Sequence, residues 1–203
     1  MEVEEIIANN DNKEEMLKAV KESGKNLDLV SERLKDDEEI VRTAIIQDGE
    51  ALEFASDRLK DNKEILKLAI ETAPWTICYA SERLRADKEI IFESCKKYGQ
   101  ALYFASEELR NDREVVKAAV ENKGIIIKYA SSRLIDDKEL AEIAVKQNKQ
   151  AYHFISNRLK EDEDIKSLMW FELINKLVLL NIYTDDKNYA IYSFLHNVND
   201  LVQ

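Results

Sequence analysis

Serine is the residue whose type and spacing first suggest chemistry in this chain, because it recurs at intervals of 25 residues. A serine hydroxyl can act as a nucleophile, and the acidic residues that recur at the same interval could act as acid and base. A catalytic residue is needed once in a protein, whereas a packing residue is needed in every structural repeat. The recurrence therefore favours a structural role. The serines are Ser31, Ser56, Ser81, Ser106, Ser131 and Ser156.

These serines are expected to be small residues inside helices, where the hydroxyl bonds the backbone carbonyl one turn back. Arginine stands two residues after each serine except Ser106, which is followed by Glu108. We expect the arginines and the recurring acids to cap helices or to form a ladder of ion pairs between repeats. Each exposed pair would contribute only about 0–1 kcal/mol.

Cysteine and histidine are too few and too scattered to indicate a metal or thiol site. The chain has two of each, without the C-x-x-C or H-x-x-x-H spacing of metal ligands. Cys95 stands where the other repeats have valine or isoleucine, which predicts a buried small hydrophobic residue. Cys78 and His153 occupy a variable position typical of exposed surface. The sequence predicts no catalytic residue, no metal and no cofactor.

The elements that carry these residues follow from the helix breakers. The four glycines and the single proline all fall at one point of the 25-residue period, which predicts a tight turn between two helices. Half a period away, Asp or Asn stands where a helix N-cap is expected, with acids in the first turn. In one repeat this predicts an A helix from Asp37 to Gln47 and a B helix from Glu50 to Lys60.

Helices this short are marginal alone and gain stability by stacking on their neighbours. The sequence therefore predicts an all-α fold: an α-solenoid of about six 25-residue two-helix repeats with a C-terminal helical cap. Its parts are an N-terminal cap with the first A helix (residues 1–24), the repeats (25–165) and the cap (166–203). The last part carries more apolar bulk than one helix stripe can hide. This leaves open a self-association or partner-docking surface in its place.

The repeated phrase itself is similar to a known family. The segments are "ALEFASDRLKDNKEILKLAI", "ALYFASEELRNDREVVKAAV" and "IIKYASSRLIDDKELAEIAV". They resemble the bacterial repeat family called domain of unknown function 4116, over roughly residues 25–165. The resemblance implies an all-helical repeat protein of bacterial origin and supplies no activity.

Charge and composition narrow the classes of partner. The net charge of −11 speaks against direct binding to nucleic acid or to an anionic membrane, because both require basic patches. The N-terminus lacks the pattern of a secretory signal, and no segment is apolar and long enough to span a bilayer. We expect a cytoplasmic protein.

The irregular positions are the candidates for binding. Aromatic or apolar residues in the third and fourth repeats replace the polar residues of other repeats, as aromatic anchors do in protein interfaces. A local repacking around Pro74 and Trp75 is the alternative explanation. The candidate protein-binding residues are Trp75, Cys78, Phe92, Tyr98 and Tyr103.

The leading hypothesis is a non-enzymatic helical-repeat scaffold for protein–protein interaction. The alternative is an acidic inhibitor or decoy, of the kind that some phages encode, that occupies a basic cleft of a nucleic-acid-processing complex. Salt separates the two, because decoy binding would collapse at high ionic strength whereas an aromatic contact would persist. An enzyme ranks third.

Overall fold

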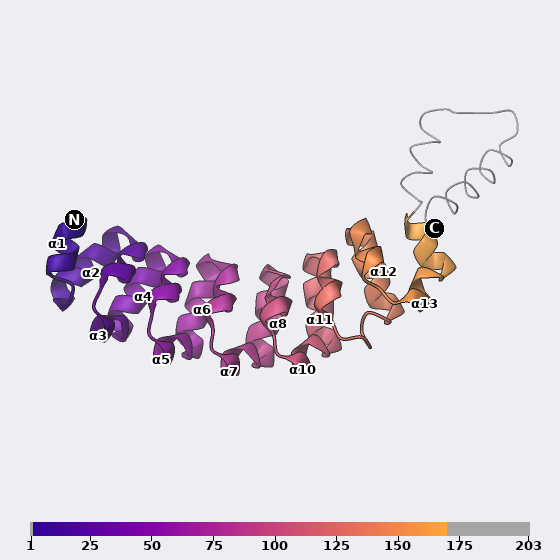
Figure 1. The fold of residues 1–203 in the computed structure, drawn as a ribbon, viewed down its shortest axis with the longest axis horizontal. Coiled ribbons are helices and arrows are strands. Elements are labelled where there is room, and N and C mark those ends of the chain that lie inside the picture. Colours follow the sequence, from indigo (N-terminus) through magenta and orange to yellow (C-terminus); the bar gives the residue numbers. More distant parts are fainter. Residues whose placement is uncertain (1, 170–203) are drawn as a thin grey trace, which may run out of the picture.

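A row of repeated helical units makes up the protein in the computed structural model, which describes residues 2–169. The described chain contains helices and no strand, so the predicted all-α solenoid is confirmed. The row is bowed, and short helices follow its convex edge (Figure 1). One continuous core runs from Ile6 to Ile165.

Each repeat consists of three parts rather than the two that we predicted. The first part is a long α-helix: α2 (Lys13–Glu22), α4 (Glu38–Gln47), α6 (Lys63–Thr72), α8 (Lys88–Lys97), α11 (Arg113–Asn122) and α12 (Lys138–Gln147). The second is a 3-10 helix, replaced in the fourth repeat by α9 (Ala101–Phe104): η1 (Gly24–Leu29), η2 (Gly49–Phe54), η3 (Pro74–Tyr79), η4 (Gly124–Tyr129) and η5 (Lys149–His153).

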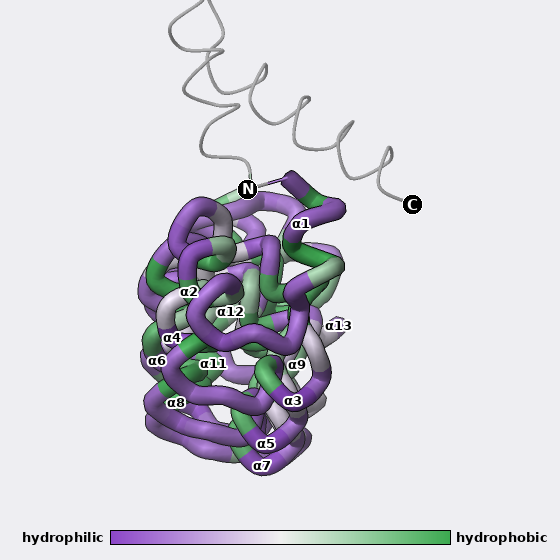
Figure 2. The backbone as a smooth tube through the Cα atoms, turned by 90° about the vertical axis from the view of Figure 1, so that its left-hand side faces the viewer, coloured by the Kyte–Doolittle hydropathy of each residue, from purple (hydrophilic) through white to green (hydrophobic). Residues whose placement is uncertain are grey.

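The third part is one turn of α-helix, replaced in the fifth repeat by a turn: α3 (Glu32–Lys35), α5 (Asp57–Lys60), α7 (Glu82–Arg85), α10 (Glu107–Arg110) and α13 (Asn157–Lys160). A first helix, α1 (Val3–Ala8), precedes the repeats, and helical residues 163–169 follow them. A view along the array shows the long helices on one side of the cross-section and α9 on the other (Figure 2).

The long helices begin and pack as predicted. The side chain of Asp37, the N-cap of α4, accepts hydrogen bonds from the backbone N–H groups of Glu39 and Ile40. Asp or Asn caps the other long helices in the same way. The predicted apolar stripe of α4 is fully buried: Ile40, Val41, Ala44 and Ile45.

The predicted B helix is wrong as a continuous element. In the second repeat, η2 ends at Phe54, and Ala55 and Ser56 are extended, with ψ of 157° and 156°. Ser56 is the N-cap of α5, and its hydroxyl oxygen accepts a hydrogen bond from the N–H of Leu59 at 3.3 Å. Serine therefore starts a new helix here, where it was expected inside one.

Close packing explains the glycines better than the turn conformation that we predicted. We call the second parts of all repeats together the second row. Three glycines are the first residues of η1, η2 and η4, and Gly99 lies two residues before α9; none of the four has a positive φ. A Cβ atom on Gly49 would lie 2.7 Å from the carbonyl oxygen of Ala69, and one on Gly99 would lie 2.7 Å from that of Ala119. The glycines thus allow the long helix of the next repeat to approach the backbone.

The N-terminal part, residues 1–24, contains α1 and α2. The C-terminal cap and the self-association predicted for residues 166–203 fall almost wholly on residues 170–203, which lie outside the described residues. Leu168 and Met169, at the end of the described chain, pack partly against the core.

Candidate protein-binding surface

The recurrent serines and arginines join each repeat to the one before it. The Ser56 hydroxyl donates a hydrogen bond to the Asp36 carboxylate, 20 residues earlier. The Nε of Arg58 lies 2.9 Å from the same carboxylate, and its Nη2 donates to the Asp36 carbonyl oxygen at 2.7 Å. The Ser56 hydroxyl, then Arg58, lower the pKa of Asp36. We call such a set of Asp or Asn, Ser and Arg a clip.

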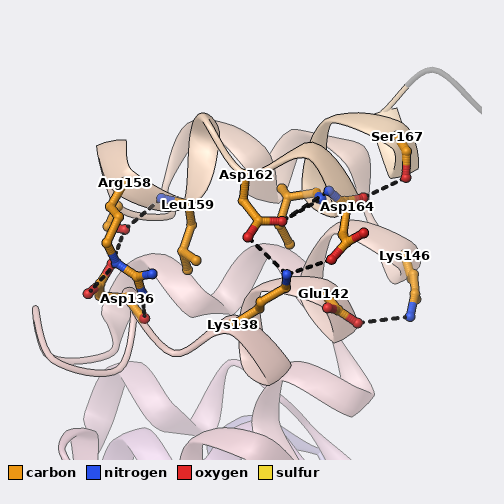
Figure 3. A network of polar contacts seen from close by, with 11 residues as sticks. Asp136, Lys138, Glu142, Lys146, Arg158, Leu159, Asp162, Asp164 and Ser167 are labelled. Atoms are coloured by element: carbon orange, nitrogen blue, oxygen red, sulfur yellow. Dashed lines mark hydrogen bonds and ion pairs between the residues drawn. The ribbon is translucent and has the colours of Figure 1, made fainter.

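Five clips are present in the described chain, and the last is drawn in Figure 3. The ladder between repeats that we predicted is confirmed. Each clip serine donates to the preceding repeat, and all of them except Ser131 are also N-caps of a short helix, whereas we expected them inside helices. The clips are Asp11–Ser31–Arg33, Asp36–Ser56–Arg58, Asp61–Ser81–Arg83, Asn111–Ser131–Arg133 and Asp136–Ser156–Arg158.

A second ladder runs along the starts of the long helices. Lys138 Nζ lies 2.9 Å from Asp162 and 2.6 Å from Asp164 (Figure 3), and Lys63 repeats this arrangement with Asp87 and Glu89. Burial raises the pKa of Asp87, but the hydrogen bonds from Lys63 and the helix backbone lower it, and the net pKa is below the ordinary value. Many of the recurrent acids thus hold neighbouring repeats together.

The two cysteines are shielded. Burial raises the pKa of Cys95 to about 12, which agrees with the prediction of a buried hydrophobic residue. Burial also raises the pKa of the half-buried Cys78, which makes its thiolate scarce at neutral pH. Within residues 2–169, no three His, Cys, Asp or Glu side chains are grouped to hold a metal ion.

The five candidate residues divide between two sides of the array. Trp75 and Cys78 lie on η3 and Tyr103 on the adjoining α9, so the structure brings these three together in the second row. Phe92 lies on α8, and Tyr98 is the residue that ends that helix. Both are half-buried against the core, and Phe92 also lies under the ammonium group of Lys96.

The second row carries exposed or half-buried aromatic side chains along four consecutive repeats. Trp75 is 44% exposed, Tyr103 is 55% exposed and Phe154 is 38% exposed. The rings of Tyr103 and Tyr129 lie 4.9 Å apart between centroids. We call this surface the aromatic strip, formed by Trp75, Tyr79, Tyr103, Tyr129 and Phe154.

Polar groups hold the rings of the strip in place. The indole N–H of Trp75 donates to Glu50 at 3.1 Å, and the hydroxyl of Tyr79 donates to Glu53 at 3.0 Å, both in the preceding repeat. Lys128 Nζ lies 4.8 Å from the ring centroid of Tyr129 and 5.7 Å from that of Phe154. Such fixed, half-exposed rings can anchor a partner at a small entropic cost.

Sequence reasoning missed Tyr79, Tyr129, Phe154 and Lys128. The three aromatic residues belong to a regular column, and regularity indicates scaffold. Their rings nevertheless remain accessible in part, since Tyr79 and Tyr129 are half-buried and Phe154 is exposed. A lysine followed directly by an aromatic residue, as at Lys128, was the available signal.

Across residues 2–169, no helix has the length and hydrophobicity that crossing a membrane requires. Neither a curated protein nor a solved structure is detectably similar to the chain. The family model described as Domain of unknown function (DUF4116) matches residues 12–60, 37–85, 87–135 and 137–166. Because these matches cover most of the chain and coincide with the stacked repeats, the protein belongs to this family.

Proposed function

We propose that this protein is a non-enzymatic helical-repeat scaffold that binds another protein through the aromatic strip. The observation that carries the proposal is the exposure of Trp75, Tyr103 and Phe154 on one row of the array. Buried aromatic residues at the centre of an interface commonly supply much of its binding energy. A bacterial cytoplasm is the setting that we propose, consistent with the two free cysteines.

The groups around the strip favour apolar contact with a protein partner over the charge-driven binding of an acidic decoy. A decoy needs free negative charge on one face, yet the acids beside the strip are engaged: Glu50 binds Lys25 and Trp75, and Glu53 binds Tyr79. Lys128 adds a positive charge to the same surface. The function proposed therefore rests on apolar contact rather than on net charge.

Affinity capture from host cells tests the proposal. The wild type is compared with Trp75→Ala/Tyr103→Ala, and with Ile7→Ala/Ile46→Ala as the matched control. Ile7 and Ile46 are 53% and 60% exposed but lie on α1 and α4, outside the second row. We expect the aromatic variant to lose a specific partner that the control retains, with unchanged circular dichroism for both.

The captured partner is then purified and its binding measured at low salt and at about 0.5 M salt, where the screening length is only a few Å. Persistence of binding supports the aromatic strip, and loss of binding at high salt supports the acidic decoy. Equal capture by the folded aromatic variant and the wild type contradicts a role for the strip.

A further inference from the structure

The joint between the third and fourth repeats, which we call the central joint, differs from the other joints of the described chain. Pro74 occupies the position that is glycine in the first, second, fourth and fifth repeats. At the glycine positions a Cβ atom would collide with the next long helix, as it would at Gly99 with Ala119. Proline has a Cβ atom and a ring, so α8 cannot approach η3 as closely as its counterparts do.

A groove marks this wider separation. The backbones of the long helices α6 and α8 lie farther apart than those of the other consecutive long helices. The space between them has a volume of about 220 Å³ and lies between Ile70 and Glu71 of α6 and Ile90, Ser94 and Lys97 of α8. The ion pair between Lys67 and Glu89 spans it at 2.9 Å.

The two joints that follow are each closed by an amide bridge, which the central joint and the two joints before it lack. Asn122 accepts a hydrogen bond from the backbone N–H of Gly99 at 2.8 Å and donates to the carbonyl of Lys96 at 3.0 Å. At the following joint Gln147 accepts from the N–H of Gly124 and donates to the carbonyl of Asn122 at 2.7 Å. At the central joint Pro74 has no N–H to donate, and Lys97 stands where Asn122 stands in the next repeat.

The clip is missing at the same joint. Ala86 replaces the Asp or Asn, so Ser106 has no side-chain acceptor across the joint, and Glu108 replaces the Arg that would bind the same acceptor. The backbone N–H of Glu108, then the hydroxyl of Ser106 in the same repeat, lower the pKa of the Glu108 carboxyl. Five other joints of the described chain retain their clips.

We propose that the central joint is a hinge that divides the array into two arms, residues 2–86 and 87–169. The remaining links can act as its pivot: Ser106 N–H donates to the Arg85 carbonyl at 3.1 Å, and Lys63 bridges Asp87 and Glu89. Bending about them opens or closes the groove. The hinge does not depend on the proposed function. Because Trp75 and Tyr103 lie on opposite arms, bending at the hinge would change the distance between them.

Pulsed electron–electron double resonance measures the distribution of distances between two spin labels and so reports this motion. In a Cys78→Ser/Cys95→Val background, one protein is labelled at Asp57→Cys/Glu107→Cys, across the central joint. The matched protein is labelled at Glu107→Cys/Asn157→Cys, across two clipped joints at the same sequence separation. The three labelled positions are the first residues of α5, α10 and α13, and all three are exposed.

We expect a broader distance distribution across the central joint than across the clipped joints, and equal widths would overturn the hinge. Ala86→Asp/Glu108→Arg restores the clip and should narrow only the first distribution. If that variant does not fold, Pro74→Gly/Lys97→Asn, which installs the amide bridge, takes its place. A folded variant of either kind that leaves the first distribution broad rejects the missing links as its cause.

Discussion

At the scale of single residues, one serine hydroxyl performs two tasks at every clip except that of Ser131, which starts a turn rather than a helix. The Ser56 oxygen accepts from the N–H of Leu59, which caps α5, while its proton goes to Asp36 of the preceding repeat. A cap and a joint are therefore fixed by the same atom. Ser106 caps α10 in the same way, but Ala86 offers it no side-chain acceptor in the preceding repeat. Ser106 is therefore a control for the contribution of the clip at Ser56.

Ser56→Ala is expected to destabilise the array more than Ser106→Ala. Loss of an N-cap costs about 1 kcal/mol, and both variants lose one. Only Ser56→Ala also removes the hydrogen bond to Asp36 of the preceding repeat, so that Arg58 is left as the one clip side chain on that carboxylate. Urea unfolding followed by circular dichroism measures the difference, and equal midpoints for the two variants would show that the clip adds no stability.

The cysteines give a second residue-scale prediction. Because burial raises the pKa of both thiols, neither is expected to react quickly with iodoacetamide at neutral pH. Cys95, which is fully buried, should be modified only after unfolding, and Cys78 should react slowly in the native protein. Peptide mass spectrometry over time distinguishes the sites, and rapid native modification of Cys95 would contradict the packing of α8.

At the scale of elements, glycine allows the second row to lie close to the long helix of the next repeat. This close approach predicts that Gly99→Ala is destabilising, by about 1–3 kcal/mol, because its Cβ would meet the Ala119 carbonyl at 2.7 Å. Pro74→Ala is the matched control, since that joint already accommodates a Cβ atom. Thermal unfolding compares the two, and an equal loss in both would argue against close approach as the reason for glycine.

The long helices could be predicted from the sequence because caps, apolar stripe and glycine all agree on their limits. The break at Ala55 and Ser56 could not, because neither residue is a helix breaker and the stripe of Ala51, Leu52 and Leu59 continues across it. A short helix started by serine has the same apolar spacing as a long one. Asp36, which accepts a hydrogen bond from the Ser56 hydroxyl and so favours the short helix, lies 20 residues earlier in the sequence.

The candidate site was predicted in part. Trp75 and Tyr103 stood out because their positions are polar in other repeats, and both are exposed on the second row. Phe92 and Tyr98 carried the same signal and instead lie half-buried against the core. Substitution pattern alone does not tell which side of a short helix faces solvent. The paired exceptions Ala86 and Glu108 were also visible in the sequence, but their meaning required the clip geometry.

At the scale of the whole molecule, the clips make stability depend on pH. Hydrogen bonds from serine, then from arginine, lower the pKa values of Asp36, Asp61 and Asp136 from 3.8. A carboxyl whose pKa is lower in the folded state stabilises the fold above the unfolded value and loses that contribution as pH falls below it. The array should therefore weaken as the pH falls through about 4.

Asp36→Asn/Asp61→Asn/Asp136→Asn tests this dependence, with the natural Asn111 clip as the precedent for an amide at that position. We expect the triple variant to show a smaller drop in urea midpoint between pH 7 and pH 3 than the wild type. An identical drop in both proteins would assign acid sensitivity to other groups, such as the carboxylates of the second ladder.

The constant spacing within the clips has a consequence for how such a gene can change. Every clip joins a serine to a residue 20 positions before it, and the six serines lie 25 residues apart without insertion. Deletion of residues 37–61 would place Asp36 opposite Ser81 and Arg83, with the same chemistry as before. Unequal recombination could thus lengthen or shorten the coding sequence by whole units while each surviving boundary remained chemically matched.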